Sequence, residues 1–146
     1  MNKMNSSRED YLITIYRLTN ENSYVNSVTL SKALGISRAS VSEMVKKLTN
    51  EKLISFIENK IELTEQGMDK AKSLISSHRL WEIFLIDYLH MSFEEAHDQA
   101  HRLEHVTGET LMLALNKFLG YPTHCPSGNK IWENIPGEVS SEEKND

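Results

Sequence analysis

Three histidines and a glutamate recur at helical spacing in the second half of this 146-residue chain. They are His97, His101, Glu104 and His105, at positions i, i+4, i+7 and i+8. On a helix this spacing puts all four side chains on one face, about one turn apart. Imidazole nitrogen and carboxylate oxygen suit borderline transition-metal ions. The spacing therefore predicts that the four residues converge in one first coordination sphere.

Two further potential ligands, His78 and Glu82, stand at i and i+4 on the predicted preceding helix. Histidines on a polar face are often only solvated, but this many at compatible spacing favours a metal site. Since thiolates are absent from these helices, the donor set suits Mn²⁺, Fe²⁺, Co²⁺, Ni²⁺ or Zn²⁺ and disfavours Cu⁺. Asp10 is a third candidate, which would tie the first helix to the histidine helix. Its alternative role is a first-turn carboxylate favoured by the helix dipole.

Helical segments that position these residues follow from apolar periodicity and capping residues. Ser92 with Glu95 forms a capping box that starts the histidine helix, and Ser37 is an N-cap candidate. Gly35 supplies a tight turn because glycine accepts positive φ. The alternation over residues 53–63 predicts two short strands and a turn. The expected helices cover roughly residues 8–19, 29–34, 38–50, 64–89, 92–105 and 108–119.

The order helix, glycine turn, helix and two-stranded wing is that of a winged helix-turn-helix. We therefore predict a mainly α fold, with a winged-helix DNA-binding domain over residues 1–72. A helical metal-binding and dimerisation domain over residues 73–130 follows. Residues 131–146 are expected to be a flexible tail, because their end is polar and without periodicity.

The charge distribution separates these two regions. The net charge is −5, but residues 1–64 contain nine Lys and Arg against seven Asp and Glu, or about +2, whereas residues 65–146 contain seven against fourteen, or −7. This asymmetry suggests an anionic partner for the first region and a cation for the second.

The longest apolar runs are far too short for a membrane span, and one cysteine rules out an internal disulfide. We therefore expect a cytoplasmic protein with no membrane partner.

The second helix of a winged helix-turn-helix fits the DNA major groove. Its exposed residues near base edges are expected to be Ser37, Arg38, Ala39, Ser40 and Ser42. Phosphate contacts, which position a protein without specifying sequence, are expected from Lys46, Lys47 and the wing residue Lys60. The alternative is that Ser37 only caps a helix and that the lysines form a solvated face.

One recognition helix offers too little contact for high affinity, and operators are usually read by dimers. The later helices have more apolar surface than a short bundle needs, so part of it is expected to form a two-fold interface. The alternative is that these side chains are all internal core. They are Leu80, Trp81, Phe84, Leu85, Leu111, Leu113, Leu115 and Phe118.

Taken together, these motifs resemble the diphtheria-toxin-repressor family of metal-dependent transcriptional repressors, which includes manganese transport regulators. The resemblance covers about residues 6–130, and its most specific part is the run from His97 to Val106. The chain is also similar at Glu9 to Leu12 with Ile15-Tyr16, at Ser40 to Ser42, at Leu63 to Gly67, and at His78 to Leu80 with Glu82.

The resemblance implies a homodimer that binds a palindromic operator near metal-uptake genes, with the metal as co-repressor. It implies that Asp10, Glu104 and His105 ligate a primary ion, and that His78, Glu82 and His97 form a neighbouring ancillary site. In manganese-type members the counterpart of His78 instead helps to form the main metal cluster. His101 stands where the family usually has Cys or Glu, and Ile13 where manganese regulators have a second carboxylate. The expected cofactor is Mn²⁺ or Fe²⁺, with Zn²⁺ or Co²⁺ as further possibilities.

Two rival functions are weighed against this one. A metalloenzyme with Glu104 as general base is disfavoured, because the H-E-x-x-H order of helix-borne zinc hydrolases is absent. We therefore do not expect an enzyme. A metal-independent winged-helix regulator with incidental histidines is the other alternative.

The segment around His124 and Cys125 resembles a family metal-binding segment. Both residues therefore stay open as extra ligands, and the alternative for Cys125 is a free thiol on a loop.

Overall fold

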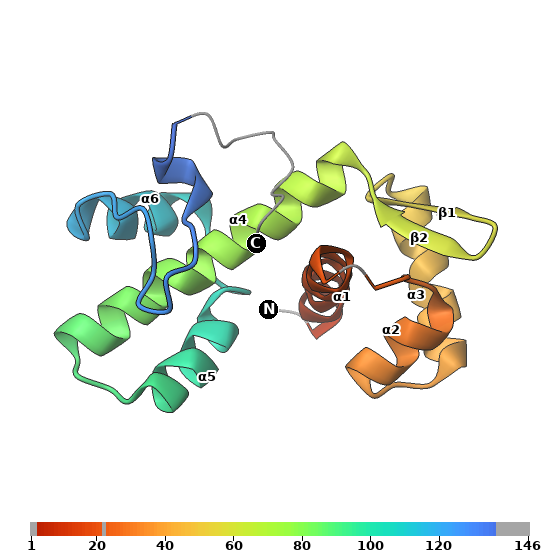
Figure 1. The fold of residues 1–146 in the computed structure, drawn as a ribbon, viewed down its shortest axis with the longest axis horizontal. Coiled ribbons are helices and arrows are strands. Elements are labelled where there is room, and N and C mark those ends of the chain that lie inside the picture. The colour runs from red at the N-terminus through yellow and green to blue at the C-terminus, as the bar shows by residue number, and fades with distance from the viewer. Residues whose placement is uncertain (1–2, 22, 137–146) are drawn as a thin grey trace. The chain divides into compact units, whose positions relative to one another are not determined.

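The computed structural model describes residues 3–21 and 23–136, and side chains from residue 8 onward. The chain divides after Lys72 into two compact units. Most of the chain is helical, with one small antiparallel sheet, which confirms the predicted fold class. Among the described residues, no helix combines the length and apolar character that crossing a bilayer requires. Figure 1 labels the elements.

The first unit is a winged helix-turn-helix. It contains α1 (Lys3–Asn20), α2 (Ser27–Leu34), α3 (Arg38–Asn50), β1 (Ile54–Ile57) and β2 (Lys60–Leu63). Gly35 is left-handed at φ 69°, which turns α2 into α3. Ser37 caps α3 by accepting a hydrogen bond from the Ser40 amide. These local features confirm the order of elements that the sequence predicts.

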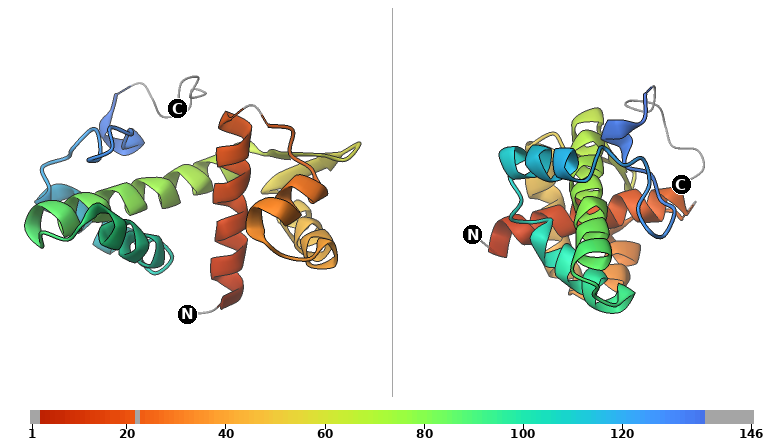
Figure 2. Two further views of the ribbon diagram at one scale, coloured as in Figure 1. Left: turned by 60° about the horizontal axis from the view of Figure 1, so that its bottom comes forward. Right: turned by 90° about the vertical axis from the view of Figure 1, so that its left-hand side faces the viewer.

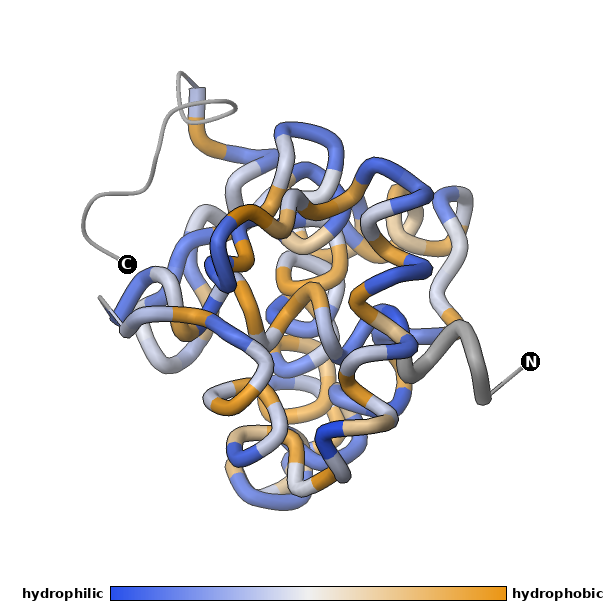
Figure 3. Tube along the Cα trace, turned by 90° about the vertical axis from the view of Figure 1, so that its right-hand side faces the viewer, coloured by the Kyte–Doolittle hydropathy of each residue, from blue (hydrophilic) through white to orange (hydrophobic). Residues whose placement is uncertain are grey.

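The core of this unit lies between α1, α2, α3 and the sheet. Leu30 of α2, Val41 and Leu48 of α3, and Ile61 of β2 are each almost fully buried. The helices alternate apolar and polar stretches along their length (Figure 3). Burying the apolar face of each helix against its neighbours supplies most of the stability that short isolated helices lack.

The wing is a tight hairpin that projects beyond the helices of its unit (Figures 1 and 2). Its strands pair in antiparallel register from Ile54 with Leu63 to Ile57 with Lys60. Glu58 and Asn59 both have positive φ, as a type I′ turn requires. The Ile61 amide also donates to the Val25 carbonyl, which fastens β2 to the loop before α2.

The second unit begins within α4 (Glu65–Ile83) and continues with the π-helix η1 (Phe84–Tyr88), α5 (Phe93–Leu103), α6 (Glu109–Phe118) and the 3-10 helix η2 (Trp132–Asn134). Its apolar cluster consists of Leu80, Ile83, Leu115, Cys125 and Ile131. The structure departs here from the sequence analysis in three places, which concern the end of α4, the end of α5 and the start of the tail.

The predicted long helix does not remain α-helical to Leu89. It widens into η1, where the Leu89 amide reaches the Phe84 carbonyl. Within η1 the rings of Phe84 and Tyr88 stack with their centroids 5.7 Å apart. Aromatic packing with Phe118 of α6 accompanies this change of helix type.

The expected flexible tail does not begin at residue 131. Ile131 is buried in the apolar cluster, and Trp132 is buried beside Arg79 of α4, which lies over its ring and donates to the Lys130 carbonyl. Asn134 exchanges side-chain hydrogen bonds with Asn116 of α6. Residues 137–146 of the expected tail lie outside the described residues.

Gly67 allows the start of α4 to approach the wing closely. A Cβ atom at this position would lie 2.0 Å from the Leu53 carbonyl oxygen, which is backbone and cannot swing away. The Thr64 hydroxyl accepts from the Gly67 amide, and the Thr64 amide donates to that same Leu53 carbonyl. The contact therefore fixes how the helix leaves the sheet.

We expect Gly67→Ala to destabilise the protein by about 3 kcal/mol or to prevent folding, since overpacking typically costs about 1–3 kcal/mol and the neighbouring backbone cannot move aside. Gly108→Ala is the control, because a Cβ there meets nothing within 4 Å. That substitution loses only an N-cap preference, about 1 kcal/mol or less. Urea unfolding measures both, and equal losses would contradict this role for Gly67.

Candidate metal centre and nucleic-acid interface

The predicted metal ligands of the second unit come from α4 and from α5 with the turn after it. His78 and Glu82 lie on α4, whereas His97 and His101 lie on α5. The last helical residue of α5 is Leu103, so Glu104 is its C-cap and His105 lies in the following turn. The Thr107 hydroxyl donates to the Leu103 carbonyl and accepts from the Trp81 indole, which holds this helix end.

The expectation of one coordination sphere for His97, His101, Glu104 and His105 is wrong. His97 instead joins His78 and Glu82, in what we call the α4 group. His101, Glu104 and His105 form the second set, which we call the Glu104 group. The division arises because residues eight positions apart, such as His97 and His105, lie about 12 Å apart along a helix, which is too far to share one ion. His97 instead contacts His78 and Glu82 of α4. The two groups follow the allocation that the family resemblance implies, and metal binding by them stays a prediction.

The α4 group has closely spaced donor atoms. Glu82 Oε2 lies 2.9 Å from His78 Nε2 and 2.8 Å from His97 Nδ1, and these two nitrogens are 3.2 Å apart. Ligand atoms bonded to one ion at about 2.1 Å lie roughly 3 Å apart in octahedral geometry. The donors therefore fit a divalent transition-metal ion without rearrangement. His97 leaves the group open to solvent, since 58% of its side chain is exposed.

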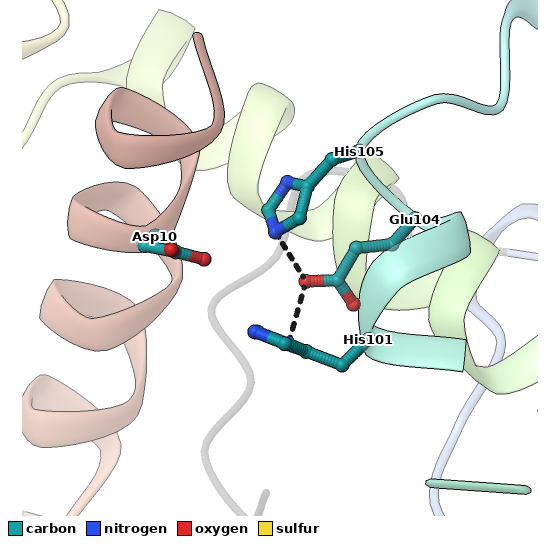
Figure 4. A group of neighbouring side chains, drawn as sticks. All are labelled: Asp10, His101, Glu104 and His105. Carbon is teal, nitrogen blue, oxygen red and sulfur yellow. Dashed lines mark ion pairs between the residues drawn. The ribbon is translucent and has the colours of Figure 1, made fainter. Parts of the chain in front are cut away.

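The Glu104 group is centred on one carboxylate oxygen, at which the ion pairs with His101 and His105 meet (Figure 4). The Glu104 side chain is buried. Glu104 Oε2 lies 3.2 Å from His101 Nδ1 and 3.3 Å from His105 Nε2. The two imidazole rings meet edge to face, with centroids 5.3 Å apart. Two nitrogens and an oxygen converging at this spacing again suit a borderline divalent ion.

The two carboxylates are held ionised by the histidines around them. Burial alone would raise the pKa of Glu104, but hydrogen bonds with His101 and His78 outweigh it, so the pKa is lowered. Burial would likewise raise the pKa of Glu82, and hydrogen bonds with His78 and His97 lower it. Both groups therefore present carboxylates in the ionised form that metal ligation requires.

His78 lies between both carboxylates. Burial alone would lower its pKa, but hydrogen bonds with Glu104 and Glu82 and the attraction of their charges raise the pKa to about 9. At neutral pH the ion-free protein therefore holds a doubly protonated His78. An ion that takes a His78 nitrogen must displace a proton.

We expect metal affinity to rise with pH up to about 9, because protons compete for His78 below its pKa. Free imidazole would level off near 6.5. Calorimetric titration with Zn²⁺ at about pH 7.5, in buffers of different ionisation enthalpy, should show release of about one proton from this residue. An affinity that is constant between about pH 7 and pH 9 would contradict this.

The remaining candidate ligands, Asp10, His124 and Cys125, differ in position and in exposure to solvent. Asp10 lies on α1 of the first unit and is half-buried. Cys125 is buried in the apolar cluster of the second unit, not exposed on its loop. His124 is exposed, and a ring nitrogen lies 3.0 Å from the Thr123 hydroxyl. The described part of the chain places neither His124 nor Cys125 in a ligand group.

One neighbour of the α4 group was not predicted. The Phe93 ring stacks on His97, with the two centroids 5.8 Å apart and the planes 24° from parallel. The spacing of i and i+4 on one helix is the signal that would have found it. Phe93 limits the orientation of the most exposed imidazole.

The predicted DNA-contacting residues lie together on the exposed side of α3 and on the wing. Val41, Val45 and Leu48 face the core, which leaves the other side of α3 open. The Ser37 hydroxyl is partly committed to capping, whereas Lys60 pairs with Glu62 at 3.3 Å. DNA contact by this surface stays a prediction. All eight predicted residues are exposed: Ser37, Arg38, Ala39, Ser40, Ser42, Lys46, Lys47 and Lys60.

A winged helix-turn-helix followed by a helical unit with two imidazole–carboxylate groups is the architecture of a metal-responsive DNA-binding protein. Residues 3–60 match the N-terminal DNA binding domain of the iron dependent repressors, and residues 64–133 match their metal binding and dimerisation domain. The chain belongs to this iron-dependent repressor family, which consists of transcriptional repressors and not of enzymes.

Three relatives show the extent of the similarity. The iron-dependent repressor IdeR of Mycobacterium bovis is 35% identical over 132 residues, which are 90% of this chain and 57% of IdeR. An HTH-type transcriptional regulator of Methanocaldococcus jannaschii is 32% identical over 80% of this chain and 94% of its own. The solved structure of the manganese regulator SloR matches this chain with a TM-score of 0.74 and 38% sequence identity. The match covers 85% of this chain and 58% of SloR. The chain thus spans little more than half the length of IdeR and SloR.

Proposed function

We propose that this protein is a metal-dependent transcriptional repressor that acts in the cytoplasm, where DNA is accessible. It binds a palindromic operator as a homodimer and controls genes for metal-ion uptake and homeostasis. The observation that supports this most strongly is the coexistence of an exposed recognition helix with two preformed imidazole–carboxylate groups in one chain. Membership of the iron-dependent repressor family supports the same function.

The proposed cofactor is Mn²⁺ or Fe²⁺, with Zn²⁺ or Co²⁺ as alternatives that the nitrogen-rich donor set also accepts. Six of the proposed ligands lie in the second unit, namely His78, Glu82, His97, His101, Glu104 and His105. We propose Asp10 as a seventh, because a carboxylate from α1 would join the winged helix to the metal centre. When bound, the ion supplies positive charge that balances the ionised carboxylates.

The regulation then follows from differential binding. Metal must stabilise the DNA-competent arrangement of the dimer more than other arrangements, since equal affinity for both would shift nothing. Arg38 and the serines at the start of α3 would face base edges, and the lysines would face phosphates. A coupling of 1–3 kcal/mol between the two sites corresponds to about 5–150-fold in DNA affinity.

We expect a random-sequence duplex pool to yield a two-fold symmetric operator with Mn²⁺ and none after chelation. DNA affinity should rise at least about 10-fold with the ion, within the usual range of allosteric coupling. His105→Ala should lose this response while keeping its fold, because it removes a ligand of the Glu104 group. Fluorescence anisotropy with the selected duplex measures both.

The matched control is His124→Ala, since this exposed histidine belongs to neither ligand group. It should keep the full metal response. Equal DNA affinity with and without every divalent ion would instead establish a metal-independent winged-helix regulator.

The structure sorts the apolar residues proposed for the dimer interface. Leu80, Leu85 and Leu115 are buried within the second unit and are therefore core. Phe118 is 59% exposed, and its ring packs with Tyr88 and Phe84. We propose that this aromatic surface of η1 and α6 meets its counterpart in a second copy.

We expect Phe118→Asp to shift the protein from dimer to monomer, because a charge would be buried at the centre of that surface. Leu113→Asp is the control, since this residue is 60% exposed and lies about 140° around α6 from Phe118. It should leave the dimer intact. Sedimentation equilibrium measures both, and a dimeric Phe118→Asp variant would place the interface elsewhere.

A further inference from the structure

The two carboxylate oxygens of Glu104 contact different ligand groups of the second unit. Oε2 is directed to His101 and His105, at 3.2 and 3.3 Å. Oε1 lies 2.8 Å from Nδ1 of His78, which belongs to the α4 group. The Glu104 side chain is almost fully buried, at 4% exposure, so water does not compete for these hydrogen bonds.

The contact with Oε1 determines which His78 nitrogen can bind metal. A carboxylate at Nδ1 holds the proton there, because an ionised oxygen can only accept. A metal ion held by the α4 group would displace the proton of Nε2, which lies 2.9 Å from Glu82 Oε2 and 3.2 Å from His97 Nδ1, the other two donors of that group. The hydrogen bond also fixes the plane of the ring.

We propose that Glu104 is the positioning residue of the α4 group, in addition to its proposed role as a ligand in its own group. It selects the tautomer and orientation of His78 without touching an ion bound by His78, Glu82 and His97. Outer carboxylates of this kind typically change metal affinity 10–100-fold. This inference rests on the proposed function, since it presumes that the α4 group binds metal.

The two roles of Glu104 are separated by removing its own group first. His101→Ala/His105→Ala leaves Glu104 with only its His78 contact and keeps the α4 group intact. In this reference variant, Zn²⁺ affinity is measured by competition with a chromophoric chelator. Adding Glu104→Ala should weaken Zn²⁺ binding about 10–100-fold. Adding Glu104→Gln should recover part of that loss, because an amide oxygen still accepts from Nδ1–H.

A second readout follows the proton itself. Long-range ¹H–¹⁵N spectra of the Zn²⁺-loaded reference variant should show the His78 Nδ1 proton protected from exchange with water by its hydrogen bond to Glu104, and Glu104→Ala should lose this protection. Circular dichroism checks that each variant is folded.

The possible outcomes are distinguishable. If the reference variant binds Zn²⁺ and Glu104→Ala binds it equally well, the positioning role is overturned and the proposed metal function stands. A Glu104→Gln variant as weak as Glu104→Ala also overturns it, because hydrogen-bond acceptance would then not be what Glu104 supplies. If wild-type protein and the reference variant both fail to bind Zn²⁺, Mn²⁺ or Fe²⁺, the proposed function fails.

Discussion

The buried carboxylate of Glu104 is the constraint on which the histidine-rich part of the molecule depends. It lies among three imidazoles, those of His78, His101 and His105, at distances of 2.8–3.3 Å. A buried charge is stable only when it is paired and hydrogen-bonded. The arrangement achieves this with side chains that are also transition-metal donors, so the interactions that stabilise the ion-free protein define the geometry of the proposed site.

This dependence explains several features around the site. The Trp81 indole donates a hydrogen bond to the Thr107 hydroxyl. That hydroxyl in turn donates to the carbonyl of Leu103, the last residue of α5 before Glu104. Arg79 secures the segment near residue 130, which covers the apolar cluster beneath α4. Glu104 therefore sits at a fixed helix end, not on a mobile loop, and its two oxygens keep distinct partners.

The winged-helix unit is built by different means. Its order of elements is fixed by local devices, namely the left-handed Gly35, the Ser37 cap and the paired positive φ angles of Glu58 and Asn59. Long-range packing adds the close approach of Gly67 to Leu53. As a result, the side of α3 opposite Val41, Val45 and Leu48 is exposed.

The sequence by itself determined the features that depend on neighbours in the chain. Helical periodicity, Ser37 and Ser92 as caps, and the alternation of the wing are local, and the structure confirms each of them. The donor types were also fixed by composition, because an imidazole and a carboxylate keep their chemistry in any fold. The family resemblance added the division of the ligands between two sites.

Only the tertiary structure decided which of these donors meet. Periodicity placed His97 and His105 on one stripe, but they lie about 12 Å apart along a helix, and the contacts with α4 join His97 to His78 and Glu82. Burial of Cys125 and of Ile131 likewise depends on residues distant in the chain, such as Leu80. A single sequence does not specify such contacts by local pattern, because they are selected by the free energy of burying the whole apolar cluster at once.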